Sequence, residues 1–238
     1  MDLPPRPRST RDRPAKPPLS EDLIVQTALE ILRQEGLDAV TMRRVATALD
    51  TGPASLYVYV GGRDELREAM LDRVTASVAI ETPDPDRWRE QLHRLVRGVL
   101  MALEAHPGIA RVAVANVPTG RNSLRFAENL LGLLLAGGID PQDAAWACDI
   151  LPLITTALAV ETATFVERGQ TDAQRAERET VARLIAVFVS LPPAEFPNLT
   201  SMIAELTSGD GDQRFEFAID TFLDGLLARA DRRRRESG

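Results

Sequence analysis

Residues 41–60 constrain the fold of this chain more than any other segment, because they have the pattern of two short helices joined by a tight turn. The segment reads TMRRVATALDTGPASLYVYV. Val45, Ala46 and Leu49 give the first helix an apolar face, and Leu56 and Val60 do the same for the second. The other face of the second helix stays free, so the segment predicts a compact helical corner that presents one helix outward.

Residues at the helix ends support this corner. Thr41 can cap the first helix, and Asp50, Thr51 and Gly52 supply turn chemistry. Pro53 suits the first turn of the second helix, where its missing N–H would have no intrahelical partner. In such a corner the second helix can enter the major groove of DNA while the first crosses the backbone. The segment therefore predicts a DNA-reading helix-turn-helix.

The flanking patterns extend this corner into a three-helix head over residues 20–66. Ser20 can cap a helix that Gly36 ends. Its apolar face consists of Ile24, Ala28, Ile31 and Leu32. A longer helix begins near Arg63 and stops before Pro83, and its apolar residues recur every four positions at Leu66, Met70, Val74 and Val78. We expect this longer helix to join the head to the rest of the chain.

The segment from about Ser20 to Leu71 resembles the tetracycline-repressor (TetR) family of bacterial transcriptional regulators. The most specific match is SLYVYVGGRDEL, whose Leu56, Tyr57, Tyr59 and Arg63 fall at positions that recur in the family. The resemblance implies that Arg43 can reach a guanine and that the bases are faced by Pro53, Ala54 and Ser55. It implies that phosphates are contacted or flanked by Thr41, Arg43, Tyr57, Tyr59 and Arg63.

The turn departs from the usual family pattern. Asp50 and Thr51 replace a common Gly-Val pair, and Gly52 replaces a capping serine. Aspartate accepts left-handed turn geometry, so the fold tolerates the change, but a carboxylate there faces DNA poorly. Residues 20–66 also hold four arginines against eight acids. Phosphate attraction must then come from local placement of Arg43, Arg44 and Arg63, with the basic residues of the N-terminal tail as a further source. These tail residues are Arg6, Arg8, Arg11, Arg13 and Lys16.

Residues 1–19 are rich in proline and arginine and poor in large apolar residues. Such a segment cannot bury enough surface to fold alone, so we expect a disordered basic arm. One interpretation is a solvated leader without a role, and the other is an arm that follows the DNA backbone or minor groove. Arg232 to Arg235 at the other end are expected to form a solvated, fraying terminus.

Residues 67–238 are predicted to form an all-α ligand-binding and dimerisation body, because helical periodicity dominates and strand alternation is missing from the sequence. The expected helices are Trp88 to Ala105, Pro107 to Asn116, Ser123 to Ala136, Asp143 to Glu167, Asp172 to Val189, Glu195 to Thr207 and Asp212 to Ala230. The apolar stretches are judged too short to span a bilayer, and no N-terminal hydrophobic leader is evident. We therefore expect a cytoplasmic protein without membrane contact.

Two helices carry a dimerisation pattern. Residues 150–160 are apolar around nearly the whole helix, which favours burial between a core and a second subunit. The last helix has an apolar stripe that fits either the core of one subunit or a partner's copy. The family resemblance favours a four-helix homodimer interface, with candidate residues Ile150, Ile154, Leu158, Phe215, Ile219, Phe222, Leu223 and Leu226.

The resemblance also implies a small-molecule effector that binds in the body. Pro152 interrupts an apolar helix and removes one backbone donor, which can kink the helix or leave a polar group available. Polar and aromatic residues nearby could orient a guest in an apolar cavity. The candidates are Asn116, Asn122, Arg125, Phe126, Trp146, Asp149, Pro152, Thr155, Thr156 and Glu161.

Other chemistries are disfavoured. Cys148 lies among apolar residues without a nearby base, as expected of an inert buried thiol. His93 and His106 lack the paired cysteine or carboxylate spacing of a zinc site, so we expect no metal and no cofactor. Phosphate-cradling glycine motifs and the common catalytic motifs are missing from the sequence, and we expect no enzymatic activity.

The favoured hypothesis is a homodimeric, ligand-released repressor that binds a palindromic DNA operator. The alternative is a helical protein-interaction module that retains the architecture but uses the Tyr57 and Tyr59 surface for a protein partner, because the head is acidic. A net charge of −7 argues against general coating of nucleic acid, so any DNA binding must be local and specific.

Overall fold

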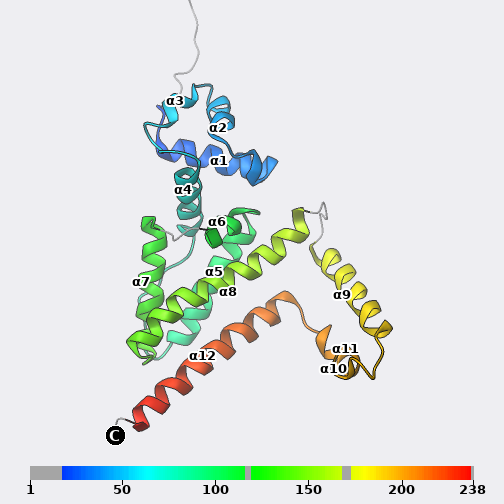
Figure 1. Ribbon diagram of the computed structural model, residues 1–238. Helices are drawn as coiled ribbons and strands as arrows, with labels where there is room; N and C mark the ends of the chain where they lie inside the picture. The colour runs from blue at the N-terminus through cyan, green and yellow to red at the C-terminus, as the bar shows by residue number, and fades with distance from the viewer. Residues whose placement is uncertain (1–17, 116–118, 168–172, 237–238) are drawn as a thin grey trace, which may run out of the picture.

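The computed structural model describes residues 18–115, 119–167 and 173–236, and every regular element in these ranges is helical (Figure 1). The all-α prediction is confirmed. The head consists of α1 (Glu21–Glu35), the short 3-10 helix η1 (Leu37–Ala39), α2 (Met42–Ala48) and α3 (Pro53–Leu56). The predicted basic arm lies outside the described residues, apart from its last two positions.

The caps of the head are those that the sequence indicates. The Ser20 hydroxyl accepts a hydrogen bond from the Leu23 amide at 3.2 Å, and the Thr41 hydroxyl accepts one from the Arg44 amide at 3.1 Å. Gly36 ends α1 with a φ of 85°, a left-handed backbone that favours glycine. The predicted apolar faces meet in one core, so these short helices hold their relative positions through tertiary packing.

Helix α4 (Arg63–Thr75) connects the head with the body, as expected. It contacts α1 on the head side and α5, α6 and α7 on the body side. Leu66, Met70 and Val74 are all buried, and Val78 is buried just beyond the end of the helix. An ion pair between Arg73 of α4 and Asp22 of α1 adds a polar link at the surface.

The body is built around α8 (Pro141–Glu167), which contacts α5 (Trp88–Glu104), α6 (Ile109–Ala115), α7 (Arg121–Ala136) and α12 (Gly211–Glu236). By length and composition, Pro141–Ala163 is apolar enough to cross a membrane, contrary to the expectation that every apolar stretch is too short. Its neighbours explain the composition in part, because α8 is the central helix of the body (Figure 1) and 39% of this stretch is buried.

Helices α9 (Ala173–Ser190), α10 (Pro197–Ser201) and α11 (Ile203–Leu206) form a separate group of helices beside α8 and α12 (Figure 1). The prediction of a single helix over 195–207 is wrong, because Met202 interrupts it with a non-helical backbone, at a φ of −116° and a ψ of 26°. Leu184, Val187 and Val189 of α9 are exposed.

Helix α12 runs antiparallel to α8, and charged side chains join the two helices at both ends. Arg214 near the start of α12 pairs with Glu161 at 3.1 Å, and Arg229 near its end pairs with Asp143 at 3.0 Å. Arg233 pairs with Asp140 at 2.6 Å, and Arg234 donates to the Gly138 carbonyl at 3.1 Å. The expectation of a fraying end is therefore wrong, because Arg233 and Arg234 fasten α12 to the turn before α8, whereas Arg232, Arg234 and Arg235 are exposed as expected.

The apolar stripe of α12 lies inside the subunit. Phe215, Ile219 and Leu223 are fully buried, and Leu226 is 7% exposed. Their assignment to a dimer interface is wrong, since one chain already covers them and they belong to its core. Phe222 of α12 and Ile154 and Leu158 of α8 are only partly buried, and Ile150 is exposed.

The Asp143 contact predicts a measurable loss of stability. Asp143 is 1% exposed and accepts hydrogen bonds from both Arg229 and Arg233. We expect Asp143→Asn to lower the free energy of unfolding by about 1–3 kcal/mol, because charge-assisted hydrogen bonds to a buried carboxylate are weakened. The measurement is urea denaturation at one fixed protein concentration.

Asp231→Asn is the matched control, because Asp231 pairs with Arg234 on the exposed surface of α12 at 3.4 Å. We expect a change within about 0.5 kcal/mol for this variant. Equal stability losses in the two variants would contradict a special role for Asp143.

Candidate DNA-binding head and ligand cavity

The exposed surface of the head centres on α3 and the turn after it. Tyr57 is 54% exposed, and Tyr59 is also exposed, whereas Leu56 and Val60 between and beside them are buried anchors. Contrary to the expected second helix, α3 ends at Leu56 and both tyrosines lie in the following turn. The Val60 amide still donates to the Leu56 carbonyl at 3.0 Å, so the chain remains tightly wound.

The predicted base-facing residues lie together on this surface. Pro53, Ala54 and Ser55 form the exposed first turn of α3, directly after the turn that carries Asp50. Asp50 has a φ of 50°, which confirms the left-handed geometry expected there. Because aspartate tolerates this geometry, the departure from the family's glycine leaves the helix-turn-helix intact.

The arginines of the head fall into two groups. Arg43 and Arg63 are exposed, and neither forms an ion pair with an acid in the described part of the chain. Arg44 instead binds Glu35, with its Nη2 2.5 Å from Oε1 and its Nε 3.2 Å from both carboxylate oxygens. This hydrogen bonding lowers the pKa of Glu35 and raises that of Arg44. Of the three arginines expected to attract phosphate, Arg44 is thus already engaged.

A cavity of about 380 Å³ lies in the body where five helices meet. This volume is within the range of about 300–1,000 Å³ found for small-molecule sites. Four predicted ligand residues line it: Phe126, Asp149, Pro152 and Thr156. The walls also include Leu71, Thr75, Val99, Leu103, Ala113, Val114, Ser123, Ala127, Cys148 and Leu153.

The remaining ligand candidates lie elsewhere. Trp146 and Arg125 are exposed, and Thr155 is buried with its hydroxyl donating to the Leu151 carbonyl at 2.9 Å. Glu161 pairs with Arg214, Asn122 is held by α4, and Asn116 lies outside the described residues. Sequence reasoning missed the contribution of α4, although the apolar Leu71 beside its expected stripe was a possible signal.

Two carboxylates of α4 hold the start of α7 beside this cavity. Asp72 accepts from the Asn122 and Ser123 amides, each at 2.9 Å, and from the Asn122 side chain at 2.8 Å. Glu68 accepts from the Thr119 amide at 3.1 Å and from its hydroxyl. A carboxylate suits this place because the first amides of a helix lack intrahelical acceptors. We call this contact the α4–α7 joint.

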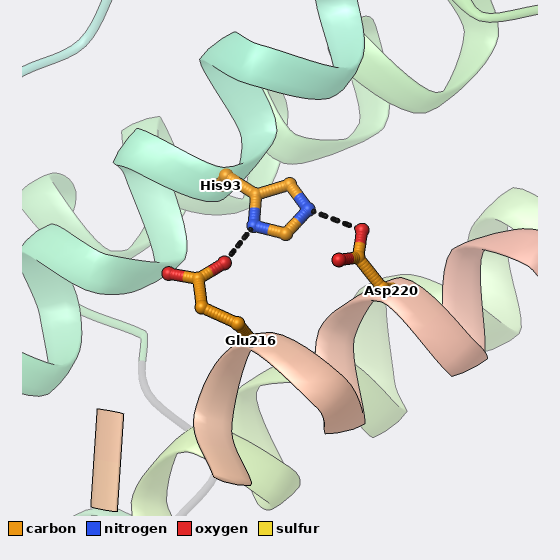
Figure 2. Close-up of side chains that lie close together, drawn as sticks. All are labelled: His93, Glu216 and Asp220. Atoms are coloured by element: carbon orange, nitrogen blue, oxygen red, sulfur yellow. Dashed lines mark hydrogen bonds and ion pairs between the residues drawn. The ribbon is translucent and has the colours of Figure 1, made fainter. Parts of the chain in front are cut away.

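A ladder of ion pairs connects α5 with α12 on another face of the body. His93 of α5 lies between two carboxylates of α12, with Nδ1 2.8 Å from Glu216 and Nε2 3.1 Å from Asp220 (Figure 2). Arg89 binds Asp220 at 2.7 Å and Arg97 binds Glu216 at 2.5 Å. The hydrogen bond from Arg89 is the main reason that the pKa of Asp220 is lowered.

The donor atoms of His93, Glu216 and Asp220 lie within 4.8 Å of one another, close enough in principle to hold a metal ion. Both carboxylates already bind arginines, however, so a cation would have to displace them. We interpret the cluster as a structural clamp on α12. Sequence spacing could not reveal it, because 127 residues separate His93 from Asp220.

Comparison with known proteins identifies this combination of head and body. Residues 24–70 match the model of the bacterial regulatory proteins of the tetR family, and residues 82–230 match the tetracyclin repressor-like C-terminal domain. The transcriptional repressor DrrR1 of Streptomyces coeruleorubidus is 31% identical over 234 residues, which cover 94% of this chain and 83% of the relative.

Solved structures agree with this assignment. Apo ActR from Streptomyces coelicolor superposes with a TM-score of 0.82 at 39% identity, over 92% of this chain and 99% of that one. ActR in complex with actinorhodin gives a TM-score of 0.81 at 40% identity, over 89% and 96% of the two chains. The fold and the site define a helix-turn-helix transcriptional regulator. The chain belongs to the TetR family and is a DNA-binding transcriptional repressor.

The α4–α7 joint can be tested through Gly120, because a Cβ added there would overlap the Asp72 side chain. We expect Gly120→Ala to destabilise the protein by about 1–3 kcal/mol, as overpacking does, and to accelerate amide hydrogen exchange at Asn122 and Ser123. Urea denaturation and exchange measured by NMR give the two readouts.

Gly211→Ala is the control, since an added Cβ there meets no heavy atom within 4 Å. Unchanged exchange at Asn122 and Ser123 in Gly120→Ala would show that the joint does not depend on this close approach.

Proposed function

We propose that this protein is a homodimeric repressor that binds a palindromic operator when its cavity is empty and releases the DNA when a small molecule occupies the cavity. The observation that carries this proposal is the position of α4. Its Leu71 and Thr75 line the cavity, while the same helix contacts α1 of the head, with Arg73 paired to Asp22. The related ActR has been solved with actinorhodin bound, which supports a small-molecule effector here.

The proposed DNA surface consists of the exposed turn of α3 and its basic edges. Pro53, Ala54 and Ser55 would face base edges, and Arg43 would reach either a guanine or a phosphate. Phosphates would also be contacted or flanked by Thr41, Tyr57, Tyr59 and Arg63. Thr41 also has a structural role, because its hydroxyl caps α2.

The proposed release mechanism follows from the contacts of α4. A guest that pushes on Leu71 or Thr75, or that shifts α7, acts on the same helix that supports the head. The α4–α7 joint couples these elements through Glu68 and Asp72. For release, the guest must bind more tightly to the arrangement that does not fit the operator, and DNA must weaken guest binding by the same factor.

The proposed dimer uses the outer faces of α8 and α12. Trp146 is 55% exposed, and Ile150 and Leu153 follow it at four- and three-residue spacing on α8. Phe217 of α12 is 72% exposed. Large apolar side chains of this kind are enriched in protein interfaces, and two linked heads can add their contacts on a palindrome.

We also propose a division into a basic arm (1–19), a DNA-binding head (20–66) and a ligand-binding and dimerisation body (67–238). The boundary at 66 falls within α4, which accords with a helix shared by the two parts. A repressor of this class acts on cytoplasmic DNA, so we place the protein in the cytoplasm, and its regulatory role requires no enzymatic step.

Operator binding can be tested by selecting bound duplexes from random DNA and measuring affinity for the selected sequence at several salt concentrations. We expect a palindrome. Arg43→Ala and Arg63→Ala should each reduce the slope of log K against log[salt] by about 0.9, because each loses one phosphate contact. Arg44→Ala should reduce it less, since Arg44 binds Glu35.

If the folded wild-type protein enriches no DNA sequence, the alternative of a protein-interaction module gains support. The next experiment is then a pull-down that compares the wild-type protein with variants of Tyr57 and Tyr59. A slope that changes equally in all three arginine variants would contradict the assignment of Arg43 and Arg63 as the phosphate-binding pair.

The dimer can be tested with Trp146→Glu and Phe217→Glu. We expect at least a tenfold weaker dimer in each case, because a buried charge replaces an apolar interface side chain. Sedimentation velocity over a concentration series measures the change. Met101→Glu is the control, since Met101 is an exposed apolar residue of α5. Dimers of undiminished affinity in both test variants would exclude this face.

A further inference from the structure

The polar groups of the cavity restrict the charge of a guest. Among the described lining residues none is basic, and Asp149 is the only carboxylate. Burial and the nearby Asp149 charge raise the pKa of the Cys148 thiol, so this thiol stays protonated and adds no second charge. An anionic guest would lose hydration without gaining a cationic partner, which is costly in an apolar site.

Two hydroxyls in the cavity wall are free to bind a guest. Ser123 of α7 is 7% exposed and Thr156 of α8 is 5% exposed. Within the part of the chain that the structure describes, neither hydroxyl has a hydrogen-bond partner, although the Ser123 backbone amide binds Asp72. Both residues line the cavity, so a guest there can hydrogen-bond to these hydroxyls and gain affinity.

Pro152 provides a further acceptor on the same wall. Proline has no N–H, so the carbonyl of Cys148 cannot receive the usual hydrogen bond from the residue four positions on. Both residues line the cavity, and Asp149 lies between them at an exposed position. The Thr75 hydroxyl donates to the Leu71 carbonyl at 3.0 Å, which leaves its own lone pairs as acceptors. The polar wall therefore offers several acceptors, and the Ser123 and Thr156 hydroxyls can donate as well as accept.

The apolar part of the wall fits a ring system. Phe126 offers an aromatic face, and Val99, Leu103 and Leu153 surround the same space as Phe126. Aromatic and aliphatic walls of this kind bind flat apolar molecules, with a few polar groups that fix orientation.

We infer that the effector is an apolar, ring-containing molecule that carries an amine or hydroxyl donor, and that its carboxylate analogues are excluded. Asp149 receives the cationic amine at the cavity opening, and Ser123 and Thr156 bind polar substituents deeper inside. This inference rests on the proposed function, because it takes the cavity as the effector site.

A matched series of three probes tests the inference: 9-(aminomethyl)anthracene, 9-anthracenemethanol and 9-anthracenecarboxylate. They share one ring and differ in charge. We expect the ammonium to bind tightest to the full-length protein and the carboxylate to bind at least tenfold more weakly than the alcohol, as followed by anthracene fluorescence. Ala127→Phe should weaken all three, because Ala127 lines the cavity and the larger side chain fills it.

Variants at the polar groups make the test specific. Asp149→Asn should lower the affinity for the ammonium about fivefold and leave the alcohol within about twofold, since a partly exposed ion pair contributes modestly. Glu128→Gln is the matched control, because it removes one negative charge on the exposed side of α7. It should change the affinity for neither the ammonium nor the alcohol. Ser123→Ala combined with Thr156→Val should weaken the alcohol as well as the ammonium.

Three results would overturn the inference: a carboxylate that binds as tightly as the ammonium, an ammonium preference that survives Asp149→Asn, or no binding of any probe. Operator affinity is measured on the same samples. If one of these results occurs and the wild-type protein still binds its operator, only the inference about the effector fails and the proposed repressor function stands. Loss of operator binding in folded wild-type protein would instead count against the proposed function itself.

Discussion

The burial of α4 on two sides is the constraint on which the rest of the molecule depends. Leu66 and Met70 are fully buried, and Leu71 and Val74 nearly so. Burying each such side chain stabilises the fold by about 1.5–3 kcal/mol, and here that energy is shared between the head and the body. The head therefore cannot change its orientation without disturbing packing in the body. A rigid helix whose buried side chains join head and body in one continuous core is the physical requirement for a signal to pass from a cavity to DNA.

The body keeps α4 in place through α5, α6 and α7, which in turn pack against α8. Helix α12 runs antiparallel to α8 and contacts it. The apolar stripe of α12 enters the core, and ion pairs with α8 fix both ends of the helix. The ladder to α5 adds a third attachment, with His93 held between Glu216 and Asp220. Since partly exposed ion pairs contribute little energy individually, their main effect is to fix the register of α12, while apolar burial supplies most of the stability.

The cavity and the proposed DNA surface differ in how they are assembled. Residues 41–60 form the proposed DNA surface almost alone, so the local pattern of the Thr41 cap and of Pro53 in the first turn of α3 was enough to outline the helix-turn-helix. The cavity takes its walls from five helices spread over residues 71–156. Periodicity identifies an apolar face but not the neighbour that it meets. For this reason Phe126 and Thr156 were found from the sequence, whereas Val99 and Ser123 were not.

By itself, the sequence determined the helical class, the limits of most helices, the caps of α1 and α2 and the helix-turn-helix with its left-handed Asp50. These features depend on residues within one or two turns of each other, where local sterics and hydrogen bonds act. The tertiary structure decided that the apolar stripe of α12 is buried in the core and that Asp72 accepts hydrogen bonds from the first amides of α7. It also decided that Arg44 pairs with Glu35, and that Arg233 and Arg234 bind the turn before α8. Each of the contacts with α12 or α7 joins residues distant in sequence, and packing alone selects them among many possible partners.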